Sequence, residues 1–269
     1  MFFLILLCAV TAVLSANTAE ATTLDAIERK YIGDLIYQHE CGQDPKALTS
    51  WNKNEDFASL GIGHFIWYPA GVAHKSFNES FPALLTFVEK RGMISMPAWL
   101  RNIKGNPWLS RPMFYAAIKS PKMVQLRQWL EASRDEQVLF IKARLDAALP
   151  RMVADLDPVD ADHVTRQYQR MVNTPMGYFA LMDYVNFKGE GIYLSERYQG
   201  QGWGLQQVLL AMHGENTGRI AMLSFVTSSK QRLRERVRLA PKKRHEQRWL
   251  AGWENRLDHY LQEMDRFLK

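Results

Sequence analysis

Residues 37–64, YQHECGQDPKALTSWNKNEDFASLGIGH, decide the fold expected for this chain of 269 residues. Upstream of Glu40, apolar residues in the segment 24–39 recur at helical spacing, which predicts an amphipathic first helix that ends near this glutamate. Downstream, two short stretches, 48–52 and 57–65, flank a run of turn-forming residues, which is typical of a β-hairpin. We therefore expect a helix followed directly by paired strands.

The rest of the chain carries helical patterns. They cover residues 80–90, 107–119, 121–132, a stretch from Ser133 onward, 160–172, 176–185, 205–212, 219–237 and 245–267. Ser133 and Glu136 have the spacing of a capping box, in which two side chains bond free amides at the start of a helix. The fold class predicted is α+β and predominantly α-helical, with a small N-terminal β-hairpin lobe and a larger helical lobe.

The composition, 47% hydrophobic and 23% charged, is that of a globular protein and excludes a disordered or fibrous chain. An apolar run at 2–10 is followed by small residues up to Ala21, so we interpret 1–21 as a signal peptide and 22–269 as a single domain. The expected location is periplasmic or secreted, with no transmembrane span after signal removal. Cleavage would leave Cys41 as the sole cysteine, without an internal disulfide.

A formal net charge of +6 favours a polyanionic partner. Export of the protein argues against nucleic acid as that partner. The anionic cell-envelope surface is therefore the expected partner. Lysines and arginines are dense in the segment 230–248, where most of them are expected on a solvated helix face. Its proposed role is electrostatic attraction to the envelope.

We expect the catalytic residues at the point where the first helix meets the hairpin. Glu40 lies at the helix C-terminus, where the dipole disfavours a negative charge, which suits a general acid. The hairpin ends in Ser59-Leu60-Gly61-Ile62-Gly63-His64, whose glycines allow the backbone to approach another element or a ligand. Glycoside hydrolysis needs such a layout, because one carboxyl group protonates the leaving oxygen while a second carboxylate or a held water acts on the sugar.

These residues resemble the phage-type lysozymes of the lysozyme-like superfamily, in which a glutamate ending the first helix precedes a Thr-Ile-Gly-Ile/Tyr-Gly-His strand. The resemblance covers about residues 31–65. It implies a lysozyme-like fold, Glu40 as the catalytic acid, Ser59 in the place of the family's threonine, and His64 as its neighbour at the substrate site. It also implies peptidoglycan as the substrate and neither a cofactor nor a metal.

The chain departs from that pattern at the second carboxylate. In the family an aspartate follows the glutamate after eight intervening residues and precedes the threonine by five intervening residues. Counted from Glu40 this position is Thr49, and counted back from Ser59 it is Lys53; neither is acidic. The separation between Glu40 and the serine is longer than in the family. We therefore expect a longer hairpin with the second carboxylate moved to Asp56 or Glu55, and we favour Asp56 because it adjoins the returning strand.

A second set of candidate residues lies between 186 and 207, a segment rich in glycine and aromatic residues. Glu190 and the later Gly-Leu-Gln-Gln loosely resemble the Glu and Gly-Leu-Met-Gln of lytic transglycosylases and goose-type lysozymes. Rings can stack on sugar faces and amides can bond hydroxyls. The residues assigned to this far wall of a glycan cleft are Asn186, Glu190, Tyr198, Trp203 and Gln207. An equally weighted alternative is a glycine-rich connection with a buried tryptophan.

The sequence thus predicts an exported peptidoglycan glycan-strand hydrolase, a lysozyme-like muramidase. One alternative is a lytic transglycosylase with Glu190 as the acid. Another is an envelope glycan-binding protein without catalysis, which the missing aspartate allows. A third, a chitosanase-like enzyme, is disfavoured by the positive net charge. Cys41 is expected as a packed thiol instead of a nucleophile paired with His64, and the scattered histidines give little support to a zinc site.

Overall fold

A computed structural model describes residues 24–75 and 77–269 of the chain. The segment interpreted as a signal peptide lies outside the described residues. Helix α1 (Ala26–Cys41) begins at Asp25, whose carboxylate accepts the amide hydrogens of Ile27 and Glu28 at 2.8 Å each. It ends at Gly42, which adopts the left-handed conformation typical of a helix C-cap. Glu40 therefore lies in the last turn, as predicted.

A short 3-10 turn, η1 (Pro45–Leu48), leads into an antiparallel sheet in the order β1 (Thr49–Ser50), β2 (Ala58–Leu60) and β3 (Phe65–Trp67). Opposite residues include Ser50 with Ser59 and Leu60 with Phe65. The predicted hairpin is present. The stretch 57–65 is not one strand, however, because a turn at 61–64 reverses the chain and creates a third strand.

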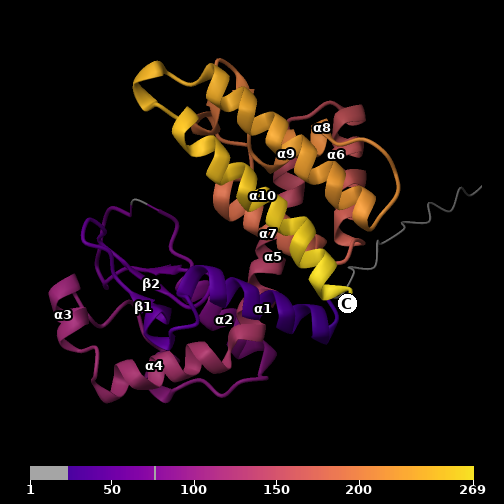
Figure 1. Ribbon diagram of the computed structural model, residues 1–269. Helices are drawn as coiled ribbons and strands as arrows, with labels where there is room; N and C mark the ends of the chain where they lie inside the picture. The colour runs from indigo at the N-terminus through magenta and orange to yellow at the C-terminus, as the bar shows by residue number, and fades with distance from the viewer. Residues whose placement is uncertain (1–23, 76) are drawn as a thin grey trace, which may run out of the picture.

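Three helices and a short turn complete the first lobe: α2 (Phe81–Arg91), η2 (Ala98–Leu100), α3 (Arg111–Ala116) and α4 (Pro121–Ala132). The expected β-hairpin lobe is therefore a mixed lobe with its own helices. A long helix, α5 (Arg134–Val153), contacts α1, α2 and α4 at its N-terminal part and α6 and α7 beyond (Figure 1). It joins the first lobe to the second.

The second lobe is mainly helical, as expected (Figure 1). It comprises α6 (Pro158–Val172), α7 (Gly177–Lys188), η3 (Leu194–Glu196), a small β4 (Arg197–Tyr198) and β5 (Gln201–Gly202) hairpin, α8 (Leu205–Ala211), α9 (Arg219–Leu239), η4 (Lys242–Arg244) and α10 (Gln247–Phe267). Helices α9 and α10 pack along each other. The fold class, α+β and predominantly helical, is confirmed.

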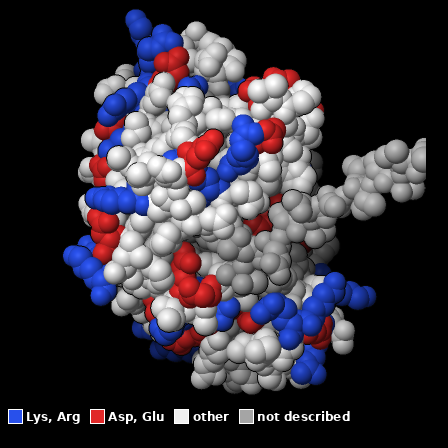
Figure 2. All heavy atoms as spheres, turned by 90° about the vertical axis from the view of Figure 1, so that its right-hand side faces the viewer, with Lys and Arg blue, Asp and Glu red and all other residues white. Residues whose placement is uncertain are grey.

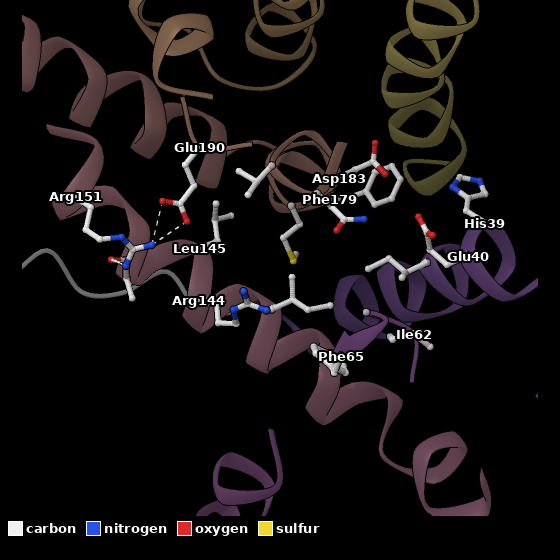
Figure 3. Close-up of a pocket in the computed structure, with 17 residues that line it drawn as sticks. His39, Glu40, Ile62, Phe65, Arg144, Leu145, Arg151, Phe179, Asp183 and Glu190 are labelled. Atoms are coloured by element: carbon white, nitrogen blue, oxygen red, sulfur yellow. Dashed lines mark hydrogen bonds and ion pairs between the residues drawn. The ribbon is translucent and has the colours of Figure 1, made fainter. Parts of the chain in front are cut away.

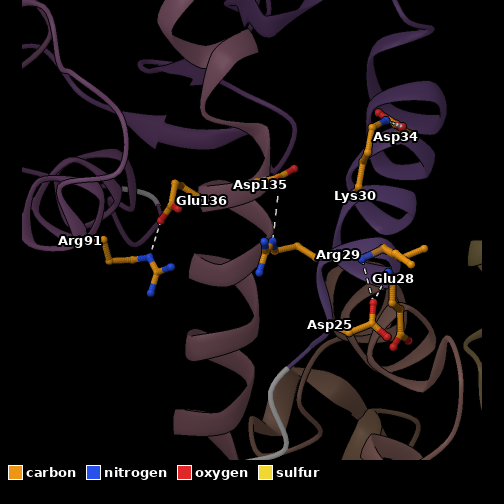
Figure 4. Close-up of polar contacts among 9 residues, drawn as sticks. Asp25, Glu28, Arg29, Lys30, Asp34, Arg91, Asp135 and Glu136 are labelled. Atoms are coloured by element: carbon orange, nitrogen blue, oxygen red, sulfur yellow. Dashed lines mark hydrogen bonds and ion pairs between the residues drawn. The ribbon is translucent and has the colours of Figure 1, made fainter.

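Ion pairs fix α1 and α2 against the start of α5 (Figure 4). Arg29 of α1 approaches Asp135 at 3.6 Å, and Arg91 of α2 binds Glu136. The predicted capping box at Ser133 and Glu136 is wrong. The carboxylate of Glu136 is taken by the arginine, and the hydroxyl of Ser133 bonds the carbonyl of Leu130 instead of a helix amide.

Buried apolar residues of both lobes form one connected cluster. In α1, Ile32 and Leu35 enter it, whereas Ile27 is 75% exposed. The two lobes therefore share one apolar core. No helix in the described part of the chain has the length and apolar character that a membrane crossing requires.

Many of the basic residues on α9 and α10 are paired with acids. Lys230 binds Asp258, Arg236 binds Glu246 and Arg234 binds Glu254, at 2.6 to 2.8 Å. On the face shown in Figure 2, basic and acidic side chains lie interspersed. Part of the positive charge of the segment 230–248 is therefore balanced by neighbouring carboxylates.

Lys188, the last residue of α7, is a buried amine between aromatic faces. Its Nζ lies 3.4 Å from the ring centre of Trp253 and 3.8 Å from that of Phe187. Burial, together with the positive charge of Arg236, lowers the pKa of Lys188 to about 7. The rings offset part of the cost of the charged form.

This shift predicts a pH-dependent stability difference between the wild type and Lys188→Met. The unfolded chain keeps the lysine proton up to its ordinary pKa of 10.5, whereas the folded chain releases it above about 7, so unfolding takes up a proton in between. Wild-type stability should therefore rise relative to the variant between those values, by at most about 1.4 kcal/mol per pH unit. Below about pH 7 the wild type carries the full cost of the buried charge.

Urea unfolding of both proteins at about pH 6 and about pH 9.5 measures this difference. The exposed Lys90 provides the control, because Lys90→Met should differ from the wild type by the same amount at both pH values. A constant difference for Lys188→Met would contradict the low pKa.

Candidate functional site

The candidate site is a cavity of about 260 Å³ between the two lobes, here called the central cavity (Figure 3). Its walls come from the end of α1, the turn before β3, the middle of α5, and α7 with the residues just after it. The lining residues are Ile36, His39, Glu40, Ile62, Gly63, Phe65, Ile141, Arg144, Leu145, Ala147, Arg151, Phe179, Met182, Asp183, Val185, Asn186 and Glu190. Apolar side chains predominate, with carboxylates and guanidiniums at the edges.

Glu40 is the carboxylate of this cavity with the loosest contacts. Its oxygens lie 3.6 Å from Nδ1 of His64 and 3.7 Å from Nη2 of Arg256, both beyond hydrogen-bond distance. Its side chain is 24% exposed. The carboxyl group therefore retains its capacity to donate or accept a hydrogen bond from a ligand.

The turn that faces Glu40 depends on close approach to α5. Gly61 has a φ of +69°, and a Cβ there would lie 2.3 Å from Oε1 of Gln137. That oxygen accepts the amide hydrogen of Ile62 at 2.9 Å. The glycine thus serves the role predicted for it, because it lets the backbone meet another element.

The cavity carries two further carboxylates, each held by an arginine: Asp183 lies beside Glu40, and Glu190 lies on the opposite side. Asp183 of α7 accepts hydrogen bonds from Arg256 at 2.6 and 2.9 Å and from the hydroxyl of Tyr260 at 2.6 Å. Glu190, just beyond α7, accepts from Nη2 of Arg151 at 2.8 and 3.1 Å. Figure 3 shows Glu190 and Glu40 on opposite sides of the cavity.

Two hollows adjoin the central cavity. One, of about 330 Å³, shares His39, Glu40, Phe179 and Asp183 with it and is completed by Arg256, His259 and Tyr260; we call it the Arg256 pocket. The other, of about 560 Å³, shares Arg151 with it. We call this one the arginine pocket. The three together form a series of hollows, with Glu40 at one boundary and Arg151 at the other.

The structure does not bring Glu55 or Asp56 to Glu40. Both precede β2, whereas the turn at the cavity follows that strand, so the strand separates them at about 3.3 Å per residue. Asp56 is exposed, and the backbone of Glu55 accepts a bond from Trp51. Ser59 is buried within β2, and none of these three lines the central cavity.

The residues predicted in the second set divide into two groups. Asn186 and Glu190 line the central cavity, as expected for the far wall. Trp203 is buried, and Tyr198 bonds Glu246, so neither reaches it. Gln207 bonds the backbone of the loop after α7 and lines the arginine pocket instead. The alternative of a glycine-rich connection therefore accounts for the two aromatic residues.

The glycine-rich connection between α7 and α8 holds the backbone of Glu190 in position through the following contacts. The carbonyl of Glu190 accepts the amide hydrogen of Gln206, and that of Gly189 accepts the amide of Leu205. A Cβ on Gly204 would lie 2.2 Å from the nitrogen of Gly191, so the two chain segments can approach only with glycine at that position. The density of glycines in the sequence reflects this contact.

Four charged side chains that line the central cavity or the Arg256 pocket were not among the predicted site residues. Asp183, Arg144, Arg151 and Arg256 lie within helices whose patterns show no sign of a site. The spacing of Asp183 and Asn186, which places both on one face of α7, is the signal that could have identified the first.

Cys41 is buried, and burial together with the charge of Glu40 raises the pKa of its thiol to about 11. The thiol is therefore protonated at neutral pH and unsuited to nucleophilic attack. Over the ranges 24–75 and 77–269, no cluster of three or more His, Cys, Asp or Glu side chains is placed to hold a metal ion.

Comparisons with protein-family models, with curated proteins and with solved structures gave no match to this chain. The arrangement of the site is therefore the basis for any functional assignment.

We predict that Gly61→Ala destabilises the protein more than the matched change Gly71→Ala. Both glycines have a positive φ, but a Cβ at residue 71 meets nothing within 4 Å. Gly71→Ala should cost about 1 to 2 kcal/mol for the left-handed backbone, and Gly61→Ala should cost at least about 1 kcal/mol more, because Gln137 must move. Urea unfolding measures both, and equal losses would mean that the contact is relieved without cost.

Proposed function

We propose that the protein is a peptidoglycan glycan-strand hydrolase, with a lysozyme-like arrangement in which Glu40 protonates the glycosidic oxygen. The observation that carries this proposal is the Glu40 carboxyl group, which faces a largely apolar cavity and has ion-pair contacts at 3.6 and 3.7 Å but no hydrogen bond within the described chain. The other two carboxylates of the cavity, Asp183 and Glu190, are hydrogen-bonded to arginines. An acid must offer its proton to the substrate, so it cannot be occupied by a strong protein partner. Glu40 meets this requirement better than Asp183 or Glu190.

We propose Glu190 as the second carboxylate, in place of Asp56 or Glu55. It lies across the cavity from Glu40, and a substrate between them would have one carboxyl group on each side. That layout suits protonation of the leaving oxygen by Glu40 and orientation of a water, or stabilisation of the sugar cation, by Glu190. Arg151 holds Glu190 in position for this role.

The series of hollows supports a polymeric substrate. Glu40 lies where the central cavity meets the Arg256 pocket, so a chain that crosses this boundary would present a linkage between two sugar units to the acid. Apolar walls such as Phe179 offer surfaces on which sugar faces pack. The helix that ends at Glu40 and the sheet that follows it also support the resemblance to phage-type lysozymes.

A lytic transglycosylase is the second candidate, because Glu190 lines the same cavity as Glu40. In that reaction one acid suffices, and a hydroxyl of the substrate replaces water. The two enzymes leave different products, since hydrolysis gives reducing ends and transglycosylation gives anhydro ends.

The test is mass analysis of fragments that the purified protein releases from isolated cell walls. Glu40→Gln should lower the rate of release roughly 100- to 10,000-fold, because the amide cannot donate the proton to the leaving oxygen. Glu190→Gln should also lower it if this residue acts on water or on the sugar cation. Glu89→Gln, an exposed change on α2, is the matched control and should leave the rate unchanged.

Each result has a definite meaning when circular dichroism shows that the variants fold. Undiminished release by Glu40→Gln would overturn its role as the acid. Anhydro ends from the wild type would favour the transglycosylase. Binding to walls without any fragments would mean a glycan-binding protein and would refute the proposal.

A further inference from the structure

The arginine pocket contributes only Arg151, which holds Glu190, to the proposed cleavage step. It is built from the end of α5, the β4–β5 hairpin, α8 and α9. Its lining residues are Arg151, Asp155, Leu156, Ile192, Leu194, Arg197, Gly200, Gln201, Gly202, Gln206, Gln207, Leu210, Ala211 and Arg232. Three guanidiniums from three different elements therefore converge on one space, with Asp155 as the acidic group among these lining residues.

Two of these arginines have unpartnered donors. Nε of Arg197 and Nε of Arg232 are buried from solvent, and neither has a hydrogen-bond partner within the described chain. A buried donor without a partner costs about 1 to 3 kcal/mol. These two Nε atoms are closed to the pocket as well as to bulk solvent, so a ligand in the pocket would meet the terminal Nη groups of the same two side chains, which are partly exposed and line it.

The chemistry of the donors indicates an oxyanion. A guanidinium presents planar N–H donors whose spacing matches the two oxygens of a carboxylate. Amides of Gln201 and Gln207 add neutral polar groups at the wall. A neutral sugar would leave the positive charge of the pocket unbalanced, whereas a carboxylate would offset it.

Arg151 ties this pocket to the central cavity, because it lines both and binds Glu190 on the cavity side. A ligand in the arginine pocket would therefore lie beside a sugar in the central cavity. Peptidoglycan has this shape, since acidic peptides branch from its glycan strand.

We propose that the arginine pocket binds a carboxylate of the peptide that branches from the glycan strand, and so selects peptide-bearing glycan. This inference rests on the proposed function, and it assigns Arg197 and Arg232 as specificity-determining residues. Neither contacts the bond that Glu40 is proposed to cleave.

The first test compares two polymers, glycan strands that carry their acidic peptides and the same strands after an amidase has removed them. Arg232→Gln should lower kcat/KM on the peptide-bearing strands about tenfold, the value of one charge-assisted contact, and should leave kcat/KM on the stripped strands unchanged. Arg219→Gln is the matched control. It lies on the same helix, α9, is paired with Asp265 and does not line the pocket. An equal loss on both polymers would overturn the proposal.

The second test is independent of activity. Calorimetry should detect binding of the isolated acidic peptide to the wild type, and about tenfold weaker binding to Arg232→Gln at the same ionic strength. Inorganic sulfate is the comparison ligand. Absence of peptide binding, or sulfate binding as tight as that of the peptide, would overturn the assignment to a peptide carboxylate.

The two proposals can fail separately. Peptide binding that depends on Arg232, without fragments from either polymer, would support the pocket and refute the hydrolase. Fragments from both polymers at equal rates, without peptide binding, would support the hydrolase and refute the pocket.

Discussion

The arrangement of the site depends on the contact between the turn after β2 and the buried amide of Gln137 on α5. Its oxygen accepts the amide hydrogen of Ile62, while its nitrogen donates to the carbonyl of Leu130 and the hydroxyl of Ser133. The side chain is fully buried, so loss of any of these bonds would leave an unpaired polar group. This network fixes the distance between the sheet and α5, and with it one wall of the central cavity.

The sequence predicted the parts of the fold that local patterns encode. The end of α1, the start of α4 at Pro121 and most helix positions followed from periodicity and breakers. It failed where a tertiary contact overrides a local signal. Glu136 has the spacing of a capping box but pairs with Arg91, and the glycines at 61 and 63 belong to a turn, since the close approach to Gln137 reverses the chain there.

The candidate site was predictable only in part, for the same reason. Glu40, Asn186 and Glu190 could be selected because each lies beside a recognisable motif. Asp56 was selected by its nearness along the chain, but a strand separates it from the cavity. Arg151 meets Glu190 across 39 residues of sequence and Arg256 meets Asp183 across 73, and no local pattern records which acid such an arginine will meet.

Helix α7 is braced from two sides. At its middle Asp183 binds Arg256 of α10, and just beyond its C-terminal end Glu190 binds Arg151 of α5. A rotation of α7 about its axis would have to break one of these ion pairs, and each breakage would leave a partly buried charge alone. The spacing of the acidic groups is therefore set before any ligand arrives, and the entropic cost of ordering them does not fall on the binding step.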